Sequence, residues 1–247
     1  MISSPQNEKL KLVRKLRERK HREREGLFAS EGEDLLAAGL AAGAAPRFVL
    51  LAVDSSPSVS LPLDSGIQVE EVEPELLDGV STLGSGTRAI AVWPLAWAEQ
   101  PVAPCLYLHA VGDPGNVGTI IRSADALIGT SVVLGPGCAD PYSPKAVRAS
   151  MGSVFAQPPT RAGIGATREP RAALVAHGGE GLDALAGAAT ICLGAEREGL
   201  PAEVLAACES RVTIPLRAGA AESLNVAAAA AIAAQRISSP VMQEDRP

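Results

Sequence analysis

Short apolar runs alternate with stretches of helical spacing through the second half of this 247-residue chain. The first run, residues 105–111, is almost continuously apolar, as in a strand that is buried on both faces within a parallel sheet. Further strands are expected at residues 131–134, 173–176, 190–193 and 211–214. Helices are expected at residues 117–127, 144–151 and 224–235. This alternation predicts an α/β domain built on a parallel sheet with helices on both faces.

The first half of the chain has the pattern of a smaller α/β domain. Leu10, Val13 and Leu16 recur at helical spacing in a basic N-terminal helix that Gly26 ends. Ser30 is suited to cap a second helix, with Glu33 completing a capping box. Strands are expected at residues 47–53, 67–72 and 88–92, and a short helix at 75–80. Prolines between residues 94 and 104 mark a linker, so the predicted domains are 1–95 and 105–247, joined by 96–104.

The composition is that of a globular protein, since hydrophobic residues make up 47% of the chain. Aromatic residues are only 3%, so the core must be built from Ala, Leu, Val and Ile. The charged N-terminus lacks the apolar segment of a signal peptide. The longest apolar run, residues 226–234, is far below the roughly 20 residues that a membrane span needs. We therefore expect a soluble, cytoplasmic protein.

The cysteines lie far apart in the sequence, at Cys105, Cys138, Cys192 and Cys208. None of them forms a C-x-x-C pair, the usual sign of a zinc site or a redox dithiol. We therefore expect reduced, buried thiols and no metal site.

The net charge of −6 conceals a basic N-terminal region. Residues 1–25 contain nine Lys or Arg and four Glu, a balance of 9 − 4 = +5, so the remainder carries −6 − 5 = −11. A basic cluster on an acidic protein favours contact with a phosphate backbone. The alternative is a solvated helix face in which interleaved glutamates maintain solubility.

Three polar blocks follow predicted strands in the second half of the chain. The first contains Asn116 and Arg122, the second is centred on Glu196, and the third runs from Ser223 to Asn225. Polar residues at several strand ends of one α/β domain indicate a single ligand site. The dinucleotide-binding G-x-G-x-x-G pattern is missing from the strand–helix turns, and so is the P-loop pattern.

Each block alone also has a purely structural explanation. Asn116 would cap a helix that carries Arg122 on its surface, and Ser223 or Asn225 would cap the last helix. Gly194 would allow a tight turn after a strand.

Taken together, the three blocks resemble the signature of the SpoU/TrmH family of RNA ribose 2′-O-methyltransferases, in the SPOUT class. The resemblance covers about residues 105–236. The matching positions are Asn116, Gly118 and Arg122, then Gly194, Glu196, Gly199 and Leu200, and finally Ile214, Pro215, Ser223, Leu224 and Asn225. The segment between the first two blocks also matches, at Asp140, Pro141, Lys145, Arg148, Ser150 and Gly152. Residues 1–95 more weakly resemble the small α/β, ribosomal-protein-like substrate-binding domain of rRNA-modifying members, through F-A-S-E-G at 28–32 and the run at 88–92.

This resemblance implies a deep trefoil knot at the C-terminal end, which general folding rules would not predict. It also implies a homodimer and S-adenosylmethionine bound in a bent form. The cofactor-binding residues implied by the resemblance are Leu193, Gly194, Glu196, Gly199, Ile214, Pro215, Leu216, Ser223, Leu224 and Asn225.

The implied reaction is in-line attack of a ribose 2′-hydroxyl on the sulfonium methyl group. Arg122 matches the family's catalytic arginine, and because a guanidinium is a poor base, we expect it to stabilise the developing alkoxide. Asn116 would orient the ribose or Arg122, and Glu196 would hold Arg122 or a loop of the partner subunit. Ser223 and Asn225 would shape the pocket. His109, within an apolar strand, is expected to be structural.

RNA contact is expected from basic residues in two regions, Lys9, Arg14, Arg17 and Lys20 near the N-terminus and Lys145 and Arg148 near the site. The N-terminal domain favours rRNA over tRNA. The alternatives are tRNA ribose methylation, a non-catalytic RNA-binding protein on the same scaffold, and a Rossmann-type nucleotide enzyme. Missing glycine patterns weigh against the last of these.

Overall fold

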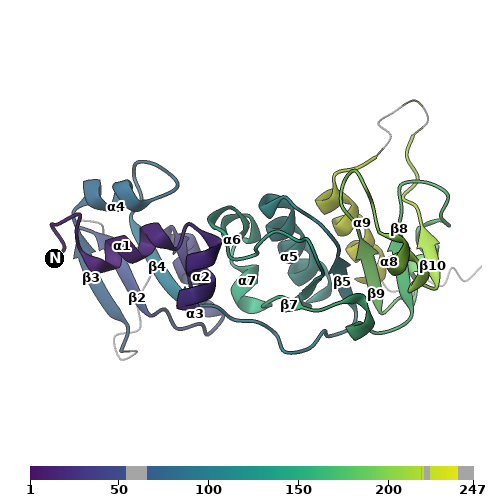
Figure 1. Ribbon diagram of the computed structural model, residues 1–247, viewed down its shortest axis with the longest axis horizontal. Coiled ribbons are helices and arrows are strands. Elements are labelled where there is room, and N and C mark those ends of the chain that lie inside the picture. Colours follow the sequence, from purple (N-terminus) through teal and green to yellow (C-terminus); the bar gives the residue numbers. More distant parts are fainter. Residues whose placement is uncertain (54–65, 218, 220–222, 239–247) are drawn as a thin grey trace, which may run out of the picture. The chain divides into compact units, whose positions relative to one another are not determined.

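The computed structural model describes residues 1–53, 66–217, 219 and 223–238. Two compact units emerge from the contacts between residues (Figure 1). The first is Met1–Ala96 together with Asp140–Ala156, and the second is Trp97–Ala139 together with Gln157–Pro247. The expected catalytic domain, 105–247, includes residues 140–156, which the structure instead groups with the N-terminal unit. No helix in the described ranges is both long and apolar enough to cross a membrane.

The first unit contains a four-stranded sheet in the order β1-β4-β2-β3. Its strands are β1 (Leu27–Glu31), β2 (Phe48–Ala52), β3 (Gln68–Val72) and β4 (Ala89–Pro94). Strand β4 is antiparallel to both β1 and β2, whereas β2 and β3 are parallel. The helices are α1 (Glu8–Lys15), α2 (Arg19–Glu25), α3 (Glu33–Ala41), α4 (Pro74–Val80), α6 (Pro144–Ser150) and α7 (Ser153–Ala156).

The basic N-terminal stretch forms two helices, not the single helix predicted. The Asn7 side chain caps α1 by accepting a hydrogen bond from the Lys9 amide at 2.9 Å. The predicted apolar stripe is confirmed, because Leu10, Val13 and Leu16 are buried in a core shared with β2, β4 and α4. A turn at residues 16–18 starts a second helix, α2, which ends as predicted at Gly26 with a φ of 66°.

The capping box predicted at Ser30 is wrong. Residues Leu27–Glu31 form strand β1, and Gly32 is the N-cap of α3. The Ser30 hydroxyl instead accepts a hydrogen bond from the Trp93 indole at 2.8 Å. The antiparallel pairing of β1 with β4, 59 to 67 residues away, overrides the local capping pattern.

Residues 140–156 are held in the first unit by a buried ion pair and an aromatic cluster. The Arg22 guanidinium, 3% exposed, donates to Asp140 Oδ2 at 2.6 and 2.9 Å. Phe28 lies 4.7 Å from the Tyr142 ring and 5.6 Å from the Phe155 ring, between centroids. This segment therefore covers β1, although its sequence neighbours belong to the other unit.

The second unit contains a six-stranded parallel sheet in the order β10-β8-β9-β5-β6-β7. Its strands are β5 (Cys105–Leu108), β6 (Val132–Leu134), β7 (Thr160–Arg161), β8 (Arg171–Leu174), β9 (Thr190–Leu193) and β10 (Ser210–Val212). The helices are α5 (Pro114–Ile128), α8 (Ala202–Ala206) and α9 (Val226–Ser238), with 3-10 turns η1 (Ile164–Ala166) and η2 (Leu182–Leu185). Figure 1 shows α5 and α9 side by side, and these two helices pack together closely.

Both faces of this sheet are covered, as the apolar strands predicted. Alternate strand residues point to opposite faces, so Leu106 and Leu108 join a core with α5 and α9. Tyr107 and Cys192 face the other side, where α8 covers them. The predicted strands are confirmed with small shifts of their ends, but the first stops at Leu108, and β7 and α8 were not predicted. His109 follows the strand and is half-buried, with its Nδ1 3.5 Å from the Tyr107 hydroxyl.

Candidate functional site

A cavity of about 380 Å³ opens at the C-terminal ends of β8 and β9. In a parallel sheet this edge is where ligands bind. Its lining includes eight of the predicted cofactor residues, Leu193, Gly194, Glu196, Gly199, Ile214, Leu216, Ser223 and Leu224. Pro215 and Asn225 do not line it.

Part of the cavity wall was missed by the sequence analysis. Residues 174–176 at the end of β8 line it, as do Leu205 of α8 and Ala229 of α9. The end of β8 could have been included, because the carboxyl ends of parallel strands share one edge of the sheet. Nothing in the sequence marks Leu205 as a lining residue.

The loop after β9 is a tight turn that only glycine can begin. A Cβ atom built on Gly194 would lie 2.2 Å from the backbone of Gly199. Ala195 and Gly199 exchange backbone hydrogen bonds of 2.9 and 3.2 Å, and Gly199 has a φ of 69°. The turn therefore fixes the position of Glu196, which lies within it.

Hydrogen bonds connect one residue from each of the three polar blocks. Asn116 Nδ2 donates to Glu196 Oε1 at 2.8 Å, and Asn225 Nδ2 donates to the same oxygen at 3.0 Å. Asn225 Nδ2 also lies 3.1 Å from Asn116 Oδ1, which accepts from it. The carboxylate of Glu196 thus holds two amide side chains that are 109 residues apart in the sequence.

The prediction that an asparagine caps a helix is wrong for Asn116 and confirmed for Asn225. Asn116 is not a helix cap, because the Asp113 side chain caps α5 by accepting from the Asn116 amide at 2.9 Å. Asn225 is a cap, since its Oδ1 accepts from the Ala227 amide at 2.9 Å at the start of α9. Its Nδ2 is at the same time part of the site, so capping and site formation use opposite ends of one amide.

Arg122 lies on α5 with an exposed side chain. Its side chain makes no hydrogen bond or ion pair with any residue that the structure describes. Of the two contacts expected for Glu196, the one with Arg122 is not formed, and Asn116 and Asn225 donate to Glu196 Oε1. The contact with a loop of the partner subunit stays a prediction.

The predicted RNA-binding residues all lie in the first unit. Lys9 forms an ion pair with Glu70 and lies 5.1 Å from the centre of the Phe48 ring, and Lys20 pairs with Glu18 at 2.7 Å. Arg14 and Arg17 donate to backbone carbonyls and have no carboxylate partner in the described ranges. Lys145 and Arg148 are exposed on α6.

All four cysteines are free thiols, two of them fully buried. Within the described part of the chain, no group of three or more His, Cys, Asp or Glu residues is arranged to hold a metal ion.

Comparison with known proteins matches both units of the chain. A sequence model of the SpoU rRNA Methylase family matches residues 103–235, and one of the MRM3-like substrate binding domain matches residues 7–91. The Bacillus subtilis 23S rRNA (guanosine(2553)-2′-O)-methyltransferase RlmP is 32% identical over 241 residues, which cover 94% of this chain and 96% of that protein.

Solved structures agree with this match. A TrmH-family protein from Porphyromonas gingivalis has a TM-score of 0.81 and 35% identity, covering 96% of this chain and 98% of that one. The AdoMet-bound rRNA methyltransferase from Sinorhizobium meliloti has a TM-score of 0.83 and 28% identity, covering 95% of both chains. The chain belongs to the SpoU rRNA methylase family.

Proposed function

We propose that this protein transfers the methyl group of S-adenosylmethionine to a ribose 2′-hydroxyl in RNA, with ribosomal RNA as the favoured substrate. One observation carries the proposal: the second and third polar blocks line one cavity, and hydrogen bonds join both to Asn116 of the first. The Bacillus relative is named a 23S rRNA 2′-O-methyltransferase, which supports rRNA over tRNA.

The cavity fits the proposed cofactor. Its volume of about 380 Å³ lies in the range of small-molecule sites, and its lining is mainly apolar with few polar side chains. We assign cofactor binding to Leu193, Gly194, Glu196, Gly199, Ile214, Pro215, Leu216, Ser223, Leu224 and Asn225.

When bound, S-adenosylmethionine supplies a methyl group activated by a positively charged sulfur. A guanidinium stays protonated at neutral pH, so we assign Arg122 to stabilising the ribose oxygen as its proton leaves. Its exposed side chain, without a partner in the described ranges, is available to the substrate. Glu196 fixes the amides of Asn116 and Asn225, and Asn116 in turn orients the ribose.

The basic face of α1 is the proposed RNA contact of the first unit. Arg14, Lys15 and Arg17 have no carboxylate partner in the described ranges, whereas Lys9 and Lys20 are ion-paired. A positive charge without a carboxylate partner contributes more to the free energy of RNA binding when it contacts a phosphate. We therefore assign the larger share of binding to Arg14 and Arg17, joined by Lys15, and a smaller share to Lys9 and Lys20. Lys145 and Arg148 add positive charge to the same unit.

We further propose a homodimer, a C-terminal trefoil knot and a cytoplasmic location. Exposed apolar side chains, Leu216 and Leu224 of the cavity lining and Ile232 of α9, support a face that a second copy covers. The knot is proposed from the match of residues 103–235 to the SpoU rRNA Methylase family. Free thiols accord with a reducing compartment.

The function is tested with the purified full-length chain, radiolabelled S-adenosylmethionine and unmodified rRNA. We expect label in RNA, located on ribose because the modified position resists alkaline cleavage. Transfer to a base, or no binding of S-adenosylmethionine in calorimetry, would contradict the proposal. Transfer to unmodified tRNA but not rRNA would contradict only the substrate assignment.

A further inference from the structure

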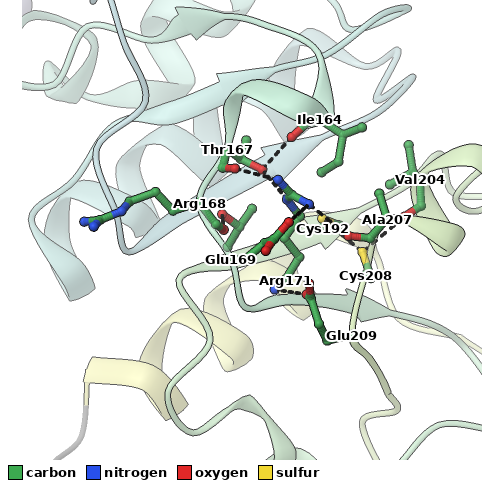
Figure 2. A network of polar contacts seen from close by, with 11 residues as sticks. Ile164, Thr167, Arg168, Glu169, Arg171, Cys192, Val204, Ala207, Cys208 and Glu209 are labelled. Atoms are coloured by element: carbon green, nitrogen blue, oxygen red, sulfur yellow. Dashed lines mark hydrogen bonds and ion pairs between the residues drawn. The ribbon is translucent and has the colours of Figure 1, made fainter.

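The fold brings together two cysteines that are well separated in the sequence. Cys192 is fully buried in β9, and Cys208 follows α8 and is half-buried. Their sulfur atoms are 3.6 Å apart, close enough to share a hydrogen bond (Figure 2). The sequence predicted reduced, buried thiols but did not indicate this pair, because 16 residues separate the two positions.

Arg171 holds the chain on both sides of Cys208. Its Nη1 donates to the Ala207 carbonyl at 3.2 Å. Its backbone amide donates to Glu209 Oε2 at 2.5 Å, and the Glu209 amide donates to the Arg171 carbonyl at 3.0 Å. Figure 2 shows these contacts converging on the Arg171 side chain and backbone beside the two sulfur atoms. These contacts fix the backbone on either side of Cys208, whose sulfur lies beside Cys192 and 3.2 Å from the Val204 carbonyl oxygen.

The surroundings give the two thiols different reactivities. The hydrogen bond with Cys192 lowers the pKa of Cys208, helped by the positive charges of Arg171 and Arg211 and opposed by burial and Glu209. The same hydrogen bond and burial raise the pKa of Cys192. Since the thiolate is the nucleophile, Cys208 is the residue that reacts first and Cys192 the one that resolves.

The chain between the two cysteines forms much of the cavity wall. Residues 193–200 all line the cavity, and so does Leu205. A disulfide would draw the sulfur atoms from 3.6 Å to about 2.05 Å. The Gly194 turn is tightly packed, because a Cβ on Gly194 would lie 2.2 Å from the Gly199 backbone. A displacement passed along this chain would reach residues that line the cavity.

We propose that Cys192 and Cys208 form a reversible disulfide that weakens binding of S-adenosylmethionine. In the first step the Cys208 thiol loses its proton, and the thiolate attacks the terminal oxygen of a hydroperoxide, forming an S–O bond and breaking the O–O bond. The leaving alkoxide or hydroxide takes up the proton that the thiol lost. In the second step the Cys192 sulfur attacks the sulfenic acid, forming the S–S bond and releasing water with the Cys192 proton. A dithiol reverses the reaction by exchange. The choice of S-adenosylmethionine as the ligand rests on the proposed function.

The test uses the full-length protein, treated with hydrogen peroxide and then with dithiothreitol. We expect mass spectrometry to find a peptide cross-link between Cys192 and Cys208. The Kd for S-adenosylmethionine should rise about fivefold or more, within the usual range of coupled sites, and return after reduction. Cys208→Ser and Cys192→Ala should each abolish the cross-link and the loss of affinity. Cys138→Ser, which changes another half-buried thiol of the same unit, should abolish neither.

Two results would overturn the inference alone: no Cys192–Cys208 cross-link in protein that binds S-adenosylmethionine normally, or a cross-link with unchanged affinity. Failure of the reduced protein to bind S-adenosylmethionine would instead contradict the proposed function, and with it the ligand named for this switch.

Discussion

Arg122 presents an exposed guanidinium without a hydrogen-bond or ion-pair partner in the described part of the chain. If it stabilises the developing alkoxide, Arg122→Ala should lower the rate of methyl transfer about 100-fold or more, the usual effect of removing one such donor. Affinity for S-adenosylmethionine and the melting temperature should stay near wild type. Arg168→Ala, which removes another exposed arginine of the same unit, is the control. Near-normal transfer by folded Arg122→Ala would remove Arg122 from the mechanism.

Glu196 accepts hydrogen bonds from Asn116 and Asn225 through one oxygen, Oε1. Glu196→Ala leaves both amides without that acceptor, so the rate should fall by roughly 10- to 100-fold as the groups at the site lose their alignment. Glu196→Gln keeps an oxygen at this position and should retain more activity. Glu198→Ala removes a neighbouring carboxylate of the cavity wall that takes no part in the hydrogen bonds among Asn116, Glu196 and Asn225. Equal losses in Glu196→Ala and Glu198→Ala would indicate that negative charge matters, not the hydrogen bonds.

Individual site residues could be predicted from the sequence, but their partners could not. Asn116, Glu196 and Asn225 stand out because polar residues follow predicted strands. Which side chain Glu196 holds depends on three loops meeting in space, and a resemblance of motifs does not give that geometry. The same limit applies to Cys192 and Cys208, whose contact depends on how α8 returns to β9.

At the scale of the element, the turn after β9 is the most constrained part of the site. Gly194→Ala places a methyl group 2.2 Å from the Gly199 backbone, so the turn must open. We expect a loss of about 1–3 kcal/mol in the free energy of unfolding, typical of overpacking, together with weaker binding of S-adenosylmethionine. Gly163→Ala is the control, since its Cβ would meet nothing within 4 Å and its φ is −75°. Calorimetry and urea unfolding compare the two, and equal behaviour would contradict the assigned role of Gly194.

The attachment of residues 140–156 to the first unit depends on Arg22. Its guanidinium binds Asp140 and also the carbonyls of Leu16 and Arg17 at the end of α1, at 2.7 and 2.8 Å. Arg22→Met leaves the Asp140 carboxylate, which is 9% exposed, without its cation. The free energy of unfolding should therefore fall by about 3–5 kcal/mol. Arg19→Ala breaks an exposed ion pair with Glu23 and should lower the free energy of unfolding by only about 0.3–0.5 kcal/mol. Urea unfolding measures both, and a similar small loss for each would contradict the importance of the buried pair.

Elements with strong local patterns could be predicted, and those defined by distant pairing could not. The strands at residues 190–193 and 48–52 are apolar throughout, so either face can be buried. Residues 27–31 instead contain a capping pattern, and they become β1 only because β4 pairs with them. Strand β7 has two residues, too few for any periodicity.

The charge distribution of the whole molecule governs how an acidic protein can bind RNA. Most of the chain is negative, with −11 outside residues 1–25, and would repel a polyanion. Within the N-terminal region, α2 carries Arg19, Lys20 and Arg24, each paired with a glutamate. The unpaired positive charges lie on or beside α1, at Arg14, Lys15 and Arg17. RNA should therefore approach the protein through α1.

This distribution predicts a measurable salt dependence. RNA affinity should fall as salt rises, because each neutralised phosphate releases a counterion. Replacing Arg14, Lys15 and Arg17 together by Gln should reduce the steepness of log K against log salt by about 2. Each of the three lost contacts with single-stranded RNA contributes roughly 0.7 to that slope. The matched triple variant, with Gln at Arg19, Lys20 and Arg24, makes the same change in net charge but removes cations that are already paired. Its slope should change much less, as filter binding over a range of salt would measure. Equal changes in the two variants would mean that total charge, and not the unpaired face of α1, attracts the RNA.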